Sequence, residues 1–66
     1  MDTFWVEEVH GGSVVSRSMI KASSLSVAKR KASMMAQVKG SELVIIRDGN
    51  VVARKCAGVG VKFKPV

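Results

Sequence analysis

Two glycine-containing turn signals, one near each end of the chain, constrain its fold more than any other feature. They are His10-Gly11-Gly12-Ser13 and Asp48-Gly49-Asn50. Glycine reaches positive φ at no steric cost, and Asp-Gly is among the strongest signals for a hairpin turn. The runs that flank the two turns have the composition of strands: residues 3–9, 14–22, 42–47 and 51–56. The sequence therefore predicts two antiparallel hairpins.

The stretch between the hairpins, residues 25–38, has the spacing of one amphipathic helix. Ser23 and Ser24 precede it as candidate N-caps, and Gly40 follows at the place of a C′ glycine. Its central apolar positions fall on one stripe of a helical wheel: Leu25, Ala28, Ala32, Met35 and Ala36. We expect Ala28, Ala32 and Met35 to face the sheet.

The remaining strand patterns complete the fold prediction. Residues 42–47 are apolar on both faces, which is typical of a central strand. Residues 59–64 alternate between apolar and polar, which predicts an edge strand that stops at Pro65. The predicted class is α+β: an antiparallel sheet of four to five strands, in the order ββαββ(β), curled around one helix.

Length and cysteine content exclude several classes of protein. A chain of 66 residues has room for one small domain, residues 1–66. Its one cysteine, Cys56, rules out a disulfide within the chain, and one cysteine with one histidine cannot complete a four-ligand zinc site. We expect no metal and no cofactor. No apolar run approaches the ~18 residues of a membrane span, and no secretory signal is expected, so the cytoplasm is the predicted location.

The sequence also predicts that the protein is not an enzyme. His10 is the only histidine and lies in a glycine-rich turn without catalytic partners. Glu7 and Glu8 are adjacent, so on a strand they point to opposite faces and cannot act as a carboxylate pair. No Gly-x-Ser-x-Gly motif is present.

The charge pattern points to a polyanionic partner. The net charge is +6, no acidic residue lies between Glu8 and Glu42, and none follows Asp48. This excess of positive charge favours binding to DNA, RNA or an acidic protein surface. The alternative is that the charges serve only to keep the protein in solution. Trp5 is a candidate for stacking or for anchoring an interface. The cationic candidates are Lys29, Arg30, Arg17, Arg47, Arg54 and Lys55.

Two segments, residues 4–9 and 22–33, resemble the small type I-F anti-CRISPR proteins of phage. In that family an antiparallel sheet curls around one helix that carries a similar Leu-Ser-x-Ala-Lys-Arg-x-Ala-Ser stretch. The likeness covers the first half of the chain; the second half matches only in strand order. It implies a non-enzymatic inhibitor that binds the host CRISPR surveillance complex and blocks access of target DNA. Lys29 and Arg30 match the Lys-Arg of the family's helix.

The chain is also similar to a family of small uncharacterised bacterial and phage domains, through Trp5, residues 42–45 and Asp48-Gly49. Three functional hypotheses therefore stay open. The first is a phage-type inhibitor that acts in the host cytoplasm on an RNA–protein complex. The second is a small basic protein that binds DNA or RNA, including duplex DNA, on its own. The third is a homodimeric structural module in which Val44 and Ile46 pair across a two-fold axis, so both a monomer and a homodimer are open.

Overall fold

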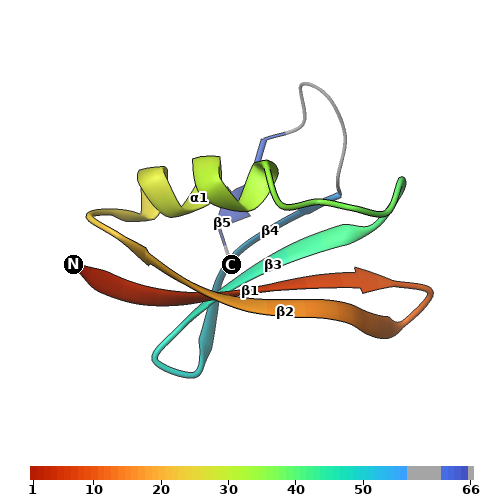
Figure 1. Cartoon of the computed structure of the whole chain (residues 1–66), viewed down its shortest axis with the longest axis horizontal. Coiled ribbons are helices and arrows are strands. Elements are labelled where there is room, and N and C mark those ends of the chain that lie inside the picture. The colour runs from red at the N-terminus through yellow and green to blue at the C-terminus, as the bar shows by residue number, and fades with distance from the viewer. Residues whose placement is uncertain (57–61, 66) are drawn as a thin grey trace.

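The structure is a computed structural model that describes residues 1–56 and 62–65. These residues form one helix and an open five-stranded sheet (Figure 1). The elements are β1 (Asp2–His10), β2 (Ser13–Ala22), α1 (Leu25–Ser33), β3 (Glu42–Arg47), β4 (Asn50–Cys56) and β5 (Lys64–Pro65). The strands lie in the spatial order β2-β1-β3-β4-β5, and every neighbouring pair is antiparallel. The predicted α+β class and ββαββ order are confirmed.

Both hairpin turns form where the glycines predict them. Gly11 and Gly12 have φ of 61° and 81°, and Asp48 and Gly49 have φ of 51° and 78°. Positive φ at both central residues is what a type I′ turn requires, and its twist matches that of the two flanking strands. These backbone angles set the register of each hairpin.

The structure describes only part of the edge strand predicted for residues 59–64, because residues 59–61 lie outside the described residues. Within the described part, β5 pairs with β4 through Ala53↔Pro65 and Arg54↔Lys64. Pro65 therefore belongs to the strand rather than stopping it. Proline is tolerated there because an edge strand has one side without a ladder partner.

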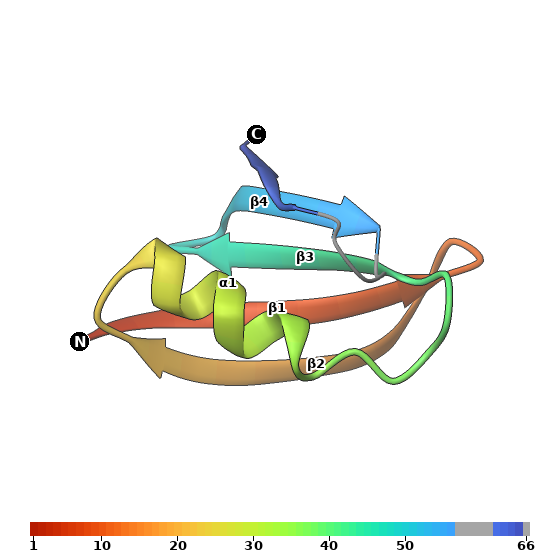
Figure 2. The ribbon, with the colours of Figure 1, turned by 90° about the horizontal axis from the view of Figure 1, so that it is seen from above.

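The core lies between α1 and one face of the sheet. Seen from above, α1 lies over β1, between β2 and β3 (Figure 2). Ala28 and Ala32 are fully buried, as the helical wheel predicts, and pack with Phe4, Leu43 and Ile45 of the sheet. Their small side chains let the helix lie close to the sheet. No helix formed by the described residues covers the opposite face of the sheet.

The helix ends earlier than predicted. We expected it to span residues 25–38, but α1 ends at Ser33. The backbone amides of Met34 and Met35 donate to carbonyl oxygens three residues earlier, at 3.2 and 3.0 Å. Such bonds tighten the last turn and close the helix. The prediction failed because the apolar pattern continues to Val38 although the helical hydrogen bonds do not.

A buried carboxylate on β1 explains why the chain leaves the helix there. Glu8 is 2% exposed, and its Oε2 accepts hydrogen bonds from the amides of Gln37 and Val38 at 2.9 and 2.8 Å. The Ser41 hydroxyl donates to the same oxygen at 2.7 Å. Gly40, with φ of 80°, therefore lies in a turn closed by the Ser41 amide and the Val38 carbonyl, and is not a C′ glycine of α1.

Candidate functional site

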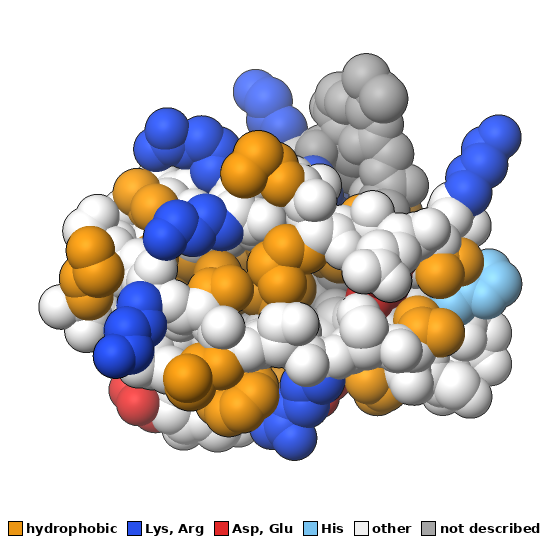
Figure 3. Space-filling model, viewed as in Figure 1, with side chains coloured by type: hydrophobic (Ala, Val, Ile, Leu, Met, Phe, Trp, Pro, Cys, Tyr) orange, Lys and Arg blue, Asp and Glu red, His pale blue; other side chains and the backbone are white. Residues whose placement is uncertain are grey.

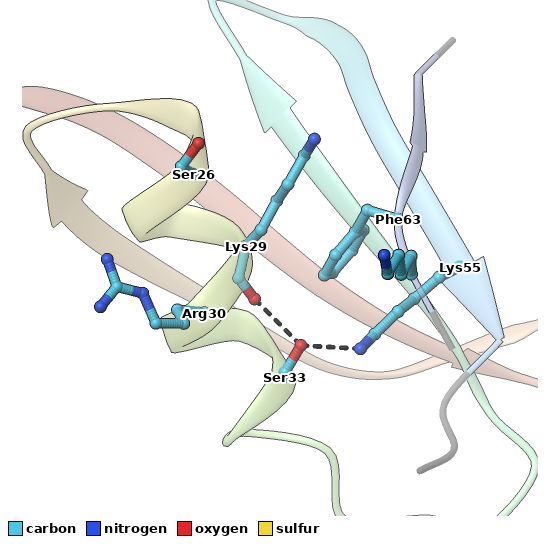
Figure 4. A pocket seen from close by; sticks show the side chains of 7 residues that line it. Ser26, Lys29, Arg30, Ser33, Lys55 and Phe63 are labelled. Atoms are coloured by element: carbon cyan, nitrogen blue, oxygen red, sulfur yellow. Dashed lines mark hydrogen bonds between the residues drawn. The ribbon is translucent and has the colours of Figure 1, made fainter. Parts of the chain in front are cut away.

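A cationic groove lies between α1 and the C-terminal part of the chain (Figure 4). Its volume is about 370 Å³. Four of the side chains that line it are cationic, and none is a carboxylate. The lining residues are Ser26, Lys29, Arg30, Ser33, Lys55, Lys62 and Phe63.

The positions of residues around the axis of α1 decide which of its side chains line the groove. Ser26, Lys29, Arg30 and Ser33 have the spacing i, i+3, i+4 and i+7, which brings them to one face of a helix. This face is not the one that buries Ala28 and Ala32. The stripe that the sequence shows as polar is therefore the side of α1 that opens into the groove.

Strand β4 brings Lys55 to the same place. Lys55 pairs in register with Leu43, whose side chain is buried on the helix-covered face, so Lys55 stands on that face too. Its Nζ donates to the Ser33 hydroxyl at 2.7 Å and lies 4.8 Å from the centroid of the Phe63 ring. The Ser33 hydroxyl in turn donates to the Lys29 carbonyl at 3.0 Å. These contacts hold one ammonium group in place within the groove.

The side chains on the helix point in two directions. In Figure 4, Lys29 and Lys55 lie on the side of α1 that faces Phe63, whereas Arg30 points to the other side of the helix. Lys29 is half-buried and Arg30 is exposed. Lys29 is partly covered because it lines the groove.

Two further hollows continue the groove on either side. One, of about 410 Å³, shares Arg30 with it and is lined also by Val27, Lys31 and Met34. The other, of about 250 Å³, shares Lys55 and Lys62. Its remaining lining residues are Glu42, Arg54, Cys56 and Lys64. Each of these two hollows thus shares lining residues with the central groove, although Arg54, in register with Val44, stands on the face of the sheet opposite to that of Lys55.

Together the hollows define a surface that we call the basic band. Seven of the eleven Lys and Arg residues line it, with one carboxylate, that of Glu42. In the space-filling view, Lys and Arg side chains stand over α1 with apolar side chains showing between them (Figure 3). The cations of the basic band are Lys29, Arg30, Lys31, Arg54, Lys55, Lys62 and Lys64.

Only some of the site residues predicted from the sequence come together in the structure. Lys29, Arg30 and Lys55 line the central groove, and Arg54 lines the adjoining hollow. Arg47 lies instead at the end of β3. Its guanidinium contacts the carboxylates of Asp2 and Asp48 at 3.1 and 3.9 Å.

Two other predicted residues lie on the helix-free face of the sheet. The Arg17 guanidinium lies 4.6 Å from the centroid of the Trp5 ring, and its Nε is 3.5 Å from a Glu7 carboxylate oxygen. Neither residue is part of the basic band. Glu7 and Glu8 do point to opposite faces, as predicted, so they form no carboxylate pair.

Sequence reasoning did not select Lys31, Lys62, Phe63 or Lys64 as site residues. A signal was present, because Lys62 and Lys64 alternate with Phe63 in a segment without acidic residues. The pattern along the sequence does not show that the fold brings this segment close to α1. Cys56, the last residue of β4, is exposed.

The described residues include no group of three or more His, Cys, Asp or Glu side chains placed to hold a metal ion. In the same part of the chain, no helix is long and apolar enough to cross a membrane. Comparison with protein-family models, with curated proteins and with solved structures finds no match for this chain.

Proposed function

We propose that the protein is a non-enzymatic nucleic-acid-binding protein that holds a phosphate backbone along the basic band. The observation that carries the proposal is the gathering of seven cations and one carboxylate in a groove and two hollows that share lining residues with it. A row of cations suits a ligand whose negative charges repeat along its length, because each neutralised phosphate releases bound counterions. We place this activity in the cytoplasm.

The side chains between the cations support the same ligand. Serine hydroxyls and Lys or Arg groups are the usual donors to phosphate oxygens, and Ser26 and Ser33 stand beside Lys29 and Arg30. The half-buried ring of Phe63 offers an apolar surface within the groove. Such contacts position a backbone and do not read base edges, so we expect binding that depends little on nucleotide sequence.

The test is a titration of fluorescein-labelled duplex and single-stranded oligonucleotides at several salt concentrations. The double variant Lys29→Glu/Arg30→Glu should bind at least about 100-fold more weakly, because it replaces two phosphate contacts by two repulsive charges. The matched control is Lys21→Glu/Lys39→Glu. It makes the same change in net charge at two exposed lysines outside the basic band.

We expect this control variant to weaken binding by less than about tenfold, because it reduces only the long-range electrostatic attraction between the protein and the oligonucleotide. Equal losses in the two double variants would show that net charge, and not the basic band, is responsible. A parent protein that binds neither oligonucleotide at low salt would refute the proposal. Circular dichroism of all three proteins checks that the fold is retained.

A second candidate is inhibition of a host type I CRISPR surveillance complex by a phage-encoded protein, in the host cytoplasm. One observation favours it: the helical stretch that resembles the type I-F anti-CRISPR family is the one that supplies Lys29 and Arg30 to the groove. In this reading the protein binds the RNA–protein complex and blocks target DNA access. The test is a target-DNA binding assay with a purified type I-F complex. Unchanged DNA binding at a large excess of the protein would exclude that candidate and leave the oligonucleotide titration unaffected.

A further inference from the structure

Phe63 is the one aromatic side chain among the described residues that line the central groove. Its ring is half-buried and packs against the hydrophobic core, which holds it in place. Figure 4 shows the ring between Lys29 and Lys55. The Lys55 ammonium lies 4.8 Å from the centroid of the ring and donates a hydrogen bond to the Ser33 hydroxyl at 2.7 Å. The groove therefore offers an aromatic ring and a cation that are held side by side.

The side chains that line the groove differ in how far they stand out from the surface. Lys29, Lys55 and Phe63 are half-buried, whereas Arg30 and Lys62 are exposed. The exposed pair can contact any polyanion that approaches this side of the molecule. The half-buried three are reached by a ligand that enters the groove, whose volume is about 370 Å³. Ligand pockets usually have volumes above about 300 Å³, so a group of the size of one nucleotide suits this space.

Only an unpaired base can bring its flat face to the Phe63 ring. In a duplex the faces of the bases are stacked on one another, and only their edges are accessible, from the major and minor grooves. In a single strand a base can turn out and stack on an aromatic side chain. This contact tolerates any sequence, because every base has a π-face. A duplex would therefore leave the ring in the groove unused.

We propose that the ligand of the basic band is single-stranded nucleic acid, with one unpaired base against the Phe63 ring and the adjoining phosphate at Lys29 and Lys55. This inference rests on the proposed function and adds the strandedness of the ligand. The described residues that line the groove include no carboxylate, so none of them repels a phosphate. The neighbouring phosphates continue to Arg30 in one adjoining hollow and to Lys62 in the other.

The test compares a fluorescein-labelled DNA single strand with the duplex of the same strand and its complement, at one salt concentration. The parent protein should bind the single strand about tenfold more tightly, because the stacking of one base adds to the phosphate contacts. Phe63→Leu keeps an apolar side chain against the core but removes the ring. It should bind the single strand about tenfold more weakly than the parent does, and the duplex within about twofold of the parent.

Two further variants separate the ring from the stability of the core. Met35→Leu changes another half-buried side chain that packs against the core, outside the basic band, and should leave both affinities unchanged. Phe63→Tyr keeps the ring and should retain the preference for the single strand. A loss in Met35→Leu as large as that in Phe63→Leu would assign the effect to the core and overturn the role of the ring.

A measurement on the unsubstituted protein guards against misfolding of a variant. The chain has two phenylalanines, Phe4 and Phe63, and Phe4 is fully buried. In protein with isotope-labelled phenylalanine, the nuclear magnetic resonance signals of the Phe63 ring should shift much more with the single strand than with the duplex. The signals of Phe4 serve as the internal reference and should stay in place.

The outcomes distinguish this inference from the function on which it rests. Equal affinity for the single strand and the duplex would overturn the inference and leave nucleic-acid binding in place. A Phe63→Leu variant that keeps the parent's preference for the single strand would do the same. A parent protein that binds neither oligonucleotide would refute both.

Discussion

At the scale of single residues, Glu8 is the most constrained side chain in the molecule. The Ser41 hydroxyl lowers the pKa of the Glu8 carboxyl below its usual value of 4.5, and the Val38 and Gln37 amides lower it further against the opposing effect of burial. A carboxylate that receives several hydrogen bonds is stabilised in its charged form. Glu8 is therefore ionised at neutral pH and is not available to a partner, since it is 2% exposed.

We expect Glu8→Gln to lower the melting temperature by several degrees at pH 7. Glutamine can place its carbonyl oxygen where Glu8 Oε2 accepts three hydrogen bonds, but that oxygen carries no negative charge, so all three hydrogen bonds become weaker. Thermal unfolding followed by circular dichroism measures the effect. The control is Glu7→Gln, the same change on the opposite face, where only the ion pair with Arg17 is lost.

The same carboxyl predicts a pH dependence. Because the pKa of Glu8 is lower in the folded chain than in the unfolded chain, its contribution is present above about pH 4.5 and is lost as pH falls through the folded value. Unfolding measured from pH 7 down to acid should show a decrease in stability that is smaller in Glu8→Gln. Parallel curves for the two proteins would contradict this role.

At the scale of elements, α1 lies close to the sheet because its buried face is built from alanine. Ala28 and Ala32 are both fully buried against the sheet. The last turn carries Arg30 and Lys31, which suits the negative end of the helix dipole. At the other end, the Ser24 hydroxyl accepts a hydrogen bond from the Val27 amide at 3.3 Å and caps the helix.

This packing predicts a position-specific cost for a larger side chain. Ala32→Gln should destabilise the fold by about 1–3 kcal/mol through overpacking, with a further cost for the buried amide. Ala36→Gln makes the same change at an exposed alanine and should stay within about 0.5 kcal/mol of the parent. Urea unfolding of both variants checks the phase of α1. Equal midpoints would mean that Ala32 does not face the sheet.

At the scale of the whole molecule, the fold gathers cations from the helix and from the C-terminal strands that are far apart in the sequence. The basic band runs over α1, β4 and β5, and at β4 it reaches the helix-free face, where Arg54 is in register with Val44. The ion pair of Arg17 with Glu7 lies on the same helix-free face, nearer to β2.

A series of single substitutions tests whether the basic band acts as a unit. Lys29→Gln, Lys62→Gln and Lys64→Gln should each flatten the slope of log affinity against log salt, by about 0.9 on duplex DNA and about 0.7 on a single strand. Lys39→Gln, at an exposed lysine outside the band, should leave the slope unchanged. Flattening by Lys39→Gln as large as that by Lys62→Gln would indicate diffuse attraction without a defined site.

The sequence by itself determined the features that depend on neighbours along the chain. Gly11, Gly12 and Gly49 specify the hairpin turns through their own backbone angles, and period-two alternation specifies which strand residues share a face. The spacing of Ala28 and Ala32 specifies the buried side of the helix. These signals act within a few residues and need no knowledge of the rest of the fold.

Only the tertiary structure decided the features that join distant segments. The helix ends at Ser33 because Glu8, thirty residues before Val38, takes the amides that a longer helix would use. Lys29 and Lys55 meet in one groove because the register of β4 places Lys55 on the helix-covered face. The pattern of hydrophobicity and charge along the sequence does not show which distant residues come into contact. The surroundings of a side chain depend on the strands and the helix that pack around it.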